Sequence, residues 1–189
     1  VTYYFIDNEY YFRRNGIYGF FDDGERFAFF SKAIVDMLRH IDFKPDILHC
    51  NDWQTALVPV YLNCYYRADE FYRDIRTVFT IHNIQYQGQY GPDMIGDVLG
   101  LPQGFVEYEG CCNLMKGAIV QSDIVSTVSP TYAHEILDEW YAHGMDRLLR
   151  ENCWKLRGIL NGIDTVGYDP QTDKHIYKNY SAAEPEGKA

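Results

Sequence analysis

This sequence of 189 residues lacks several kinds of segment, and each absence excludes a class of protein. No apolar run approaches the roughly 20 residues that cross a bilayer, and no secretory-type signal opens the chain. Lys and Arg number 17 against 27 Asp and Glu, which gives a net charge of −10. Such a surface repels nucleic acids and anionic membranes. We therefore expect a cytoplasmic protein that binds neither.

The cysteine pattern excludes a disulfide framework. Five cysteines are present, the number is odd, and no Cys-x-x-Cys motif occurs. The neighbours Cys111 and Cys112 are poorly placed to bridge each other. All five are expected to be free thiols in a reducing compartment.

Sequence motifs of several enzyme classes are missing too. There is no Gly-x-Ser-x-Gly elbow, no phosphate-binding loop ending in Gly-Lys-Ser/Thr, and no His-Glu-x-x-His pair, since His134-Glu135 lacks the second histidine. Metal ligands do not cluster. We expect no metal and no cofactor, and we find no residue set for nucleophilic hydrolysis.

Short β-rich runs alternate with helical stretches, which predicts an α/β fold. In the first long helix, apolar residues from Phe27 to Ile41 recur at steps of three and four. A Gly-, Pro- and Gln-rich loop covers 83–104, with a short helix near Met94. Strands are expected at 3–6, 47–50, 77–81, 124–128 and 157–160, and helices at 25–41, 53–66, 107–120 and 131–140.

This alternation favours a doubly wound parallel sheet of the Rossmann-like type, covered on both faces. Residues 1–165 are expected to form that domain and 166–189 a connecting tail. The chain opens inside an apparent strand without an initiator Met and stops in a polar tail. We expect it to be a piece of a longer protein, truncated at both ends.

Ligands of open α/β sheets bind outside the carboxyl ends of the strands, so the residues that follow each strand are site candidates. Four strand ends deliver polar groups, many of them amides, which suit neutral hydroxyl groups better than metals or phosphates. Each has a structural alternative, because Asp52 and Pro130-Thr131 can begin helices and Asn161-Gly162 can form a turn. His82, directly after a buried strand, favours a binding site.

At these strand ends the sequence resembles the bacterial glycogen and starch synthases. The shared sequence segments occur in the same order as in that family and with similar spacing, over nearly the whole chain. They are His49-Cys50-Asn51-Asp52-Trp53-Gln54, Phe79-Thr80-Ile81-His82-Asn83-Ile84-Gln85-Tyr86-Gln87-Gly88, Thr127-Val128-Ser129-Pro130-Thr131-Tyr132-Ala133 and Gly158-Ile159-Leu160-Asn161-Gly162-Ile163-Asp164, with Ile17-Tyr18-Gly19-Phe20 and Glu25-Arg26-Phe27-Ala28 before them.

The resemblance implies half of a two-domain retaining glucosyltransferase with its active site between two Rossmann-like domains. Such an enzyme transfers glucose from ADP-glucose to the non-reducing end of an α-1,4-glucan, without a metal. His82 matches the histidine that contacts the donor sugar, and Asp52 matches a nearby aspartate that could hold its imidazole or favour nearby positive charge. The substrate cleft and its mouth would be lined by Tyr18, Asn161, Gln85, Tyr86 and Gln87.

The family's phosphate-binding groups have no counterpart in this sequence. Its Lys-x-Gly-Gly segment would precede residue 1, and the basic pair and nucleobase pocket would lie in a C-terminal domain beyond residue 189. On this interpretation the chain alone is inactive. The alternatives are a retaining glycosyltransferase with another nucleotide-sugar donor, a non-catalytic module that binds glucan or a partner, and a chain whose site is completed by separate subunits.

Overall fold

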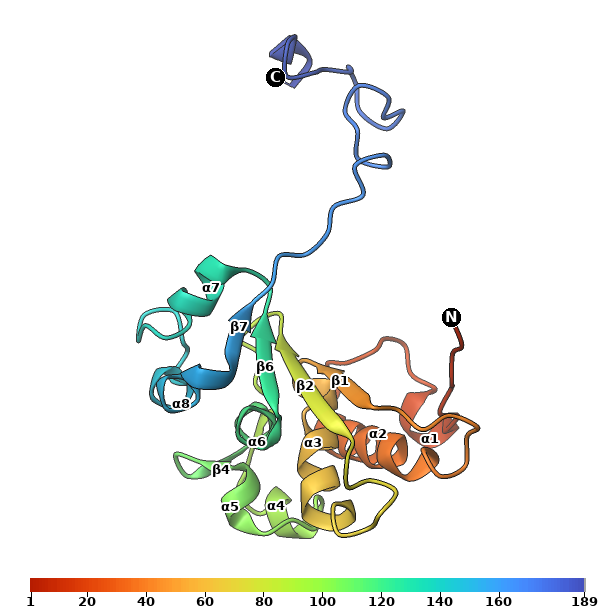
Figure 1. The fold of residues 1–189 in the computed structure, drawn as a ribbon, viewed down its shortest axis with the longest axis vertical. Coiled ribbons are helices and arrows are strands. Elements are labelled where there is room, and N and C mark those ends of the chain that lie inside the picture. Colours follow the sequence, from red (N-terminus) through yellow and green to blue (C-terminus); the bar gives the residue numbers. More distant parts are fainter. Residues whose placement is uncertain (189) are drawn as a thin grey trace. The chain divides into compact units, whose positions relative to one another are not determined.

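A computed structural model describes residues 1–188, and the chain divides into two units, Val1–Ile159 and Leu160–Ala189. The first unit is built on a sheet of four parallel strands in the order β1-β2-β6-β7 (Figure 1). The strands are β1 (Ile47–Asn51), β2 (Arg76–Ile81), β6 (Ile124–Thr127) and β7 (Leu156–Gly158). All four therefore end at the same edge, and the predicted α/β class with a parallel Rossmann-like sheet is confirmed. The predicted helical cover of both faces is not found in the first unit, because its strand order advances in one direction and the helices lie on one face.

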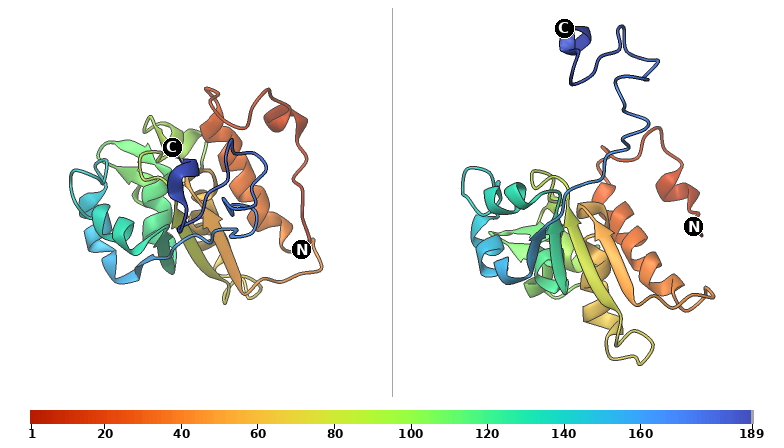
Figure 2. Two further views of the ribbon diagram at one scale, coloured as in Figure 1. Left: turned by 90° about the horizontal axis from the view of Figure 1, so that it is seen from above. Right: turned by 45° about the horizontal axis from the view of Figure 1, so that its top comes forward.

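One face of this sheet is covered by helices. Phe79, Ile81 and Val125 on that face are at most 1% exposed. Each crossover advances one strand in the same direction, and right-handed crossovers then place the connecting helices on one face. The helices of this layer, which pack against one another, are α2 (Asp23–Met37), α3 (Leu57–Tyr61) and α6 (Leu114–Gln121) (Figure 2).

On the opposite face of the sheet, polar side chains from three strands form a row of hydrogen bonds. His49 Nε2 lies 2.7 Å from Thr80 Oγ1, which lies 2.6 Å from Ser126 Oγ. His49 is exposed, as are Ile47 and Ile124 on the same face. Three adjacent strands are thus linked through side chains as well as through the backbone ladder.

A small antiparallel sheet, β3-β5-β4, occupies the region in which a helix was predicted from residue 107. Its strands are β3 (Gln89–Tyr90), β4 (Glu107–Tyr108) and β5 (Cys111–Asn113). Glu109 and Gly110 adopt positive φ of 50° and 81°, which reverses the chain between β4 and β5. Helix α6 begins only after this hairpin, where the Asn113 side chain accepts a hydrogen bond from Lys116 N.

Several further predictions differ from the structure. The helix predicted over 25–41 is α2, which ends at Met37, and the strand predicted over 157–160 is β7, which ends at Gly158. Residues 3–6 form no strand. The helix predicted over 53–66 is a succession of 3-10, α and π turns, η1 (Trp53–Thr55), α3 and η2 (Leu62–Tyr66), because Pro59 has no N–H to donate within a continuous helix. Helix α7 (Pro130–Glu135) ends earlier than predicted. The strands predicted at 47–50, 77–81 and 124–128 are confirmed to within one residue.

The remaining elements of both units are short. They are α1 (Glu9–Phe12), α4 (Met94–Asp97), α5 (Gln103–Val106), α8 (Asp146–Glu151), η3 (Cys153–Lys155) and, in the second unit, η4 (Pro185–Lys188). The short helix expected near Met94 is α4. In the second unit, Asp164 accepts hydrogen bonds from Val166 N and Gly167 N, and Asn179 donates to two backbone carbonyls.

All five cysteines are free thiols, as predicted. Burial raises the pKa of Cys50 and Cys112 to about 12, so these two thiols stay protonated and act as small apolar groups. Among the helices of residues 1–188, none is long and apolar enough to span a membrane.

Candidate functional site

The predicted site residues meet at the carboxyl edge of the sheet, where β1 and β2 end side by side. Asn51 is the last residue of β1 and pairs with Thr80, while His82 directly follows β2. Asp52 and His82 are 30 residues apart in sequence, yet the parallel register makes them neighbours.

Two hydrogen bonds connect Asp52 to the end of β2. Its backbone N donates to Thr80 O at 2.9 Å, and its Oδ1 accepts from His82 N at 2.8 Å. Its φ of 55° with ψ of −179° is a conformation that costs a non-glycine residue on the order of 1–3 kcal/mol. The Asp52 side chain makes no helix-cap hydrogen bond. The carboxylate therefore fixes the position of the His82 backbone.

The His82 imidazole is held by Asn51. His82 Nε2 lies 3.0 Å from Asn51 Oδ1, and His82 is exposed. Because an amide oxygen only accepts, Nε2 carries the hydrogen and Nδ1 of a neutral ring is an acceptor. The resemblance offered this orienting role for Asp52 as one of two possibilities, and in the structure Asn51 contacts the ring instead. Asn51 directly follows the strand predicted at 47–50, but strand-end position alone did not distinguish it from Asp52.

A cavity of about 400 Å³ opens beside these residues. Tyr18 and Tyr86, both predicted from sequence as cleft residues, line it, and both are largely exposed. The lining is Tyr18, Gly19, Asp23, Asp52, Trp53, Gln54, Asn83 and Tyr86. Flat rings beside carboxylate and amide groups can cover the apolar face of a sugar and bind its hydroxyls. A larger cavity of about 880 Å³, lined by α2 and the segment from Gly96 to Gly100, contains none of the predicted site residues.

The segment that carries Tyr18 is anchored by a buried ion pair that was not predicted from the sequence. Arg26 and Asp23 of α2 pair at 1% and 8% side-chain exposure. Asp23 Oδ2 accepts from Gly19 N at 2.6 Å and from Phe20 N at 3.1 Å, while Arg26 Nη2 donates to Ile17 O at 3.2 Å. Arg26 lay in one of the segments shared with the family, but Asp23 lay before the helix predicted from residue 25, so no sequence pattern paired the two.

In the loop after His82, Gln85, Tyr86 and Gln87 differ in their exposure to solvent. Gln85 and Tyr86 are exposed, with Tyr86 at the cavity. Gln87 is only 5% exposed, so it does not lie at the cleft mouth as expected. Its amide donates to Ile84 O and His143 O, and its Oε1 accepts from Gln89 and Asn113. Gln87 thus ties the loop to the interior of the fold.

Replacement of Gln87 by alanine should destabilise the chain markedly. Each buried partner left without a hydrogen bond costs about 1–3 kcal/mol, so we expect a loss of at least about 2 kcal/mol in the free energy of unfolding. Gln85→Ala, at an exposed neighbour, should change it by less than about 0.5 kcal/mol. Urea unfolding of both variants measures the difference, and equal midpoints would contradict the assignment of Gln87 to the interior.

The other two predicted site segments follow β6 and β7. Ser129 Oγ accepts from Tyr132 N at 2.9 Å and caps α7, in which Pro130 is the first residue, so this segment begins a helix. Asn161 belongs to the second unit and is exposed. Its place in the cleft stays a prediction. Among residues 1–188, no group of three or more His, Cys, Asp or Glu side chains could hold a metal ion.

Comparison with known proteins gives one consistent result. Residues 1–151 match the family model of the starch synthase catalytic domain. The chain is 49% identical to a glycogen synthase of Alkaliphilus metalliredigens over 96% of its own length and 39% of the relative's. It is 51% identical to a glycogen synthase of Ligilactobacillus salivarius over its whole length and 40% of the relative's.

A solved structure agrees with the sequence relatives. The catalytic domain of starch synthase IV from Arabidopsis thaliana, bound to ADP and acarbose, superimposes with a TM-score of 0.79 and 37% identity, covering 94% of this chain and 38% of that one. The chain therefore spans about 40% of the length of the curated relatives it matches. With its parallel sheet and the residues gathered at its carboxyl edge, the chain belongs to the starch synthase catalytic domain family.

Proposed function

We propose that this chain forms part of a cytoplasmic glycogen (starch) synthase. That enzyme transfers glucose from ADP-glucose to the non-reducing end of an α-1,4-glucan with retention of configuration. The observation that carries the proposal is the arrangement of Asn51, Asp52 and His82 beside the cavity lined by Tyr18 and Tyr86. Family membership and the ADP bound to the Arabidopsis relative support this donor.

The chemistry fits the groups at this edge. A retaining transfer develops positive charge on the sugar ring and negative charge on the departing diphosphate, and catalysis requires stronger binding of that state than of the substrate. His82, oriented by Asn51, would contact the donor sugar beside its reacting carbon. Asp52 would hold the His82 backbone in place and add negative charge near the developing cation.

Acceptor and donor recognition would use the remaining residues. Tyr18 and Tyr86 offer exposed rings at the cavity, and Gln85, which is exposed, would meet the acceptor. The resemblance alone supports a substrate contact for Asn161. Gln87 would act only by supporting the loop. No Lys or Arg lines the cavity among the described residues. The diphosphate would therefore need cationic groups from a C-terminal domain, and the 189-residue chain alone should be inactive.

The test is glucosyl transfer to maltoheptaose by the full-length protein encoded by the gene. We expect transfer with ADP-glucose to exceed transfer with UDP-glucose or GDP-glucose. A preference for another donor would leave a retaining glycosyltransferase and exclude the ADP-glucose assignment. A folded full-length protein that binds maltoheptaose but transfers from none of these donors would replace the enzyme proposal with a glucan-binding module.

A further inference from the structure

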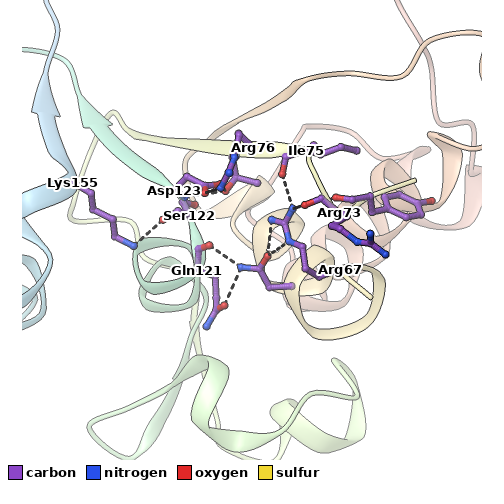
Figure 3. A network of polar contacts seen from close by, with 11 residues as sticks. Arg67, Arg73, Ile75, Arg76, Gln121, Ser122, Asp123 and Lys155 are labelled. Carbon is purple, nitrogen blue, oxygen red and sulfur yellow. Dashed lines mark hydrogen bonds and ion pairs between the residues drawn. The ribbon is translucent and has the colours of Figure 1, made fainter. Parts of the chain in front are cut away.

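A group of basic residues surrounds a cavity of about 520 Å³ at the amino edge of the main sheet, opposite the candidate site. Arg76 opens β2, Asp123 directly precedes β6 and Lys155 directly precedes β7. Figure 3 shows these side chains together with Arg67 and Arg73. We call this the basic cavity, whose charged and aromatic lining is Arg67, Arg73, Arg76, Asp123, Trp154 and Lys155. Four cations thus face one carboxylate in a chain whose net charge is −10.

Both carboxylate oxygens of Asp123 accept hydrogen bonds, and the Asp123 charge offsets that of Arg76. Its Oδ1 accepts from Arg76 Nη1 at 3.0 Å, and its Oδ2 accepts from Thr77 N at 2.8 Å and Thr77 Oγ1 at 3.0 Å. Burial alone would raise the pKa of Asp123, but these hydrogen bonds outweigh it and hold the pKa below its usual range. The carboxylate is therefore ionised, and its charge is already shared between Arg76 and Thr77.

Lys155 is 3% exposed and has no carboxylate partner within residues 1–188. Its Nζ donates to Val120 O at 2.9 Å and Ser122 O at 2.8 Å, at the end of α6, where the ammonium offsets the negative end of the helix dipole. Burial lowers the pKa of Lys155, and Asp123 opposes that shift. An ammonium has three hydrogens, so one remains for a further acceptor after these two bonds in the described part of the chain.

Arg67 and Arg73 likewise form no ion pair with a carboxylate in the part of the chain that the structure describes. Arg67 donates to the carbonyls of Tyr72, Arg73 and Ile75 and to Asn63 Oδ1, all of them neutral groups. Two guanidinium groups beside the cavity thus have no carboxylate in direct contact. Attraction for an anion is stronger in such a site than in open water.

Ser122 adds an independent observation. Its Oγ is the buried side-chain oxygen that lacks a hydrogen-bond partner among the described residues, and Ser122 lines the basic cavity. Buried polar groups without a partner are rare in folded proteins and point to a missing water, ion or ligand. A hydroxyl that rotates toward the cavity can donate to an anionic oxygen.

We propose that the basic cavity binds a phosphate-bearing anion. Its volume lies within the range of about 300–1,000 Å³ that small-molecule sites occupy. The guanidinium groups of Arg73 and Arg76 bind the phosphate oxygens, Arg76 through the donors other than the Nη1 hydrogen that bonds to Asp123, and Lys155 and Ser122 add further donors. Trp154, 69% exposed at the same cavity, offers an apolar ring to any organic group attached to the phosphate.

Titration calorimetry of the full-length protein with inorganic phosphate, diphosphate and ribose 5-phosphate, at constant ionic strength set with chloride, tests this site. We expect saturable binding that the double variant Arg73→Gln/Arg76→Gln weakens at least tenfold. Both arginines are exposed, so this variant should fold. Arg13→Gln, at an exposed arginine that directly follows α1, is the matched control and should leave binding unchanged.

The ligands separate the possible sources of phosphate. Tighter binding of ribose 5-phosphate, lost in Trp154→Ala, identifies a phosphorylated metabolite, whereas equal binding of inorganic phosphate identifies the free anion. Heat signals indistinguishable from those of added chloride would overturn the proposal. Binding that persists unchanged in the double arginine variant would overturn it as well, because the anion would then bind elsewhere.

Discussion

Replacing His82 by alanine in the full-length protein should lower kcat for glucosyl transfer by about 10²–10³, the loss typical of one transition-state hydrogen-bonding group. The backbone N–H that donates to Asp52 Oδ1 is retained in this variant, so the loop should keep its position. The loss would then report the imidazole itself. Initial rates with saturating ADP-glucose and maltoheptaose measure it.

The control for this experiment is His40→Ala. His40 is exposed in the connection between α2 and β1, so its substitution should leave kcat unchanged. Asn51→Ala frees the His82 ring without removing it and should give a smaller loss than His82→Ala. Full turnover by His82→Ala would refute the assigned role, whatever the stability of the variant.

Replacing Arg26 by methionine should destabilise the fold more than any other substitution proposed for this chain. Arg26 is 1% exposed, and its loss leaves the buried Asp23 carboxylate without a counter-ion. Removing one partner of a buried ion pair costs about 3–5 kcal/mol. The Arg26 guanidinium carbon also lies 4.9 Å from the centroid of the Phe20 ring, and Arg26 donates to Tyr11 O at 2.7 Å, so methionine replaces neither the charge over the ring nor the hydrogen bond. Chemical unfolding followed by circular dichroism measures the change.

Arg13→Met is the matched control for this change. Arg13 pairs with Glu9 at 78% and 74% exposure, and such a surface pair contributes at most about 1 kcal/mol. A loss for Arg26→Met no larger than that of Arg13→Met would contradict the anchoring role.

Because the same pair holds the segment of Tyr18, the conservative Arg26→Lys in the full-length protein should raise KM for maltoheptaose more than it lowers kcat.

Asp52 illustrates what a sequence pattern can and cannot assign. Its place after a predicted strand made it a site candidate, with a helix cap as the alternative. In the structure its side chain makes no cap bond and instead accepts from His82 N. Both partners were named from sequence, but the choice between the two roles depended on the pairing of β1 with β2, which is a long-range contact.

Gln87 is a residue whose role the sequence pattern did not reveal. In the sequence it stands in the phrase Gln85-Tyr86-Gln87 and looks equivalent to its neighbours. Only the fold turns its amide inward to Asn113 and His143, residues that are far away in sequence. Gly88 then continues the loop with φ of 65°, where a Cβ would lie 2.8 Å from the Trp53 ring. Packing, rather than residue type, separates a supporting glutamine from an exposed one.

The sequence alone determined the α/β class, the positions of three strands of the main sheet and the edge at which polar groups gather. Strand residues that are apolar or β-branched and followed by polar turns identify themselves locally. The tertiary structure decided which side chains meet. The contact between Asn51 and His82 and the basic cavity depend on strand register. The Arg26–Asp23 pair lies within one helix, and its importance depends on its burial. No local sequence pattern encodes register or burial.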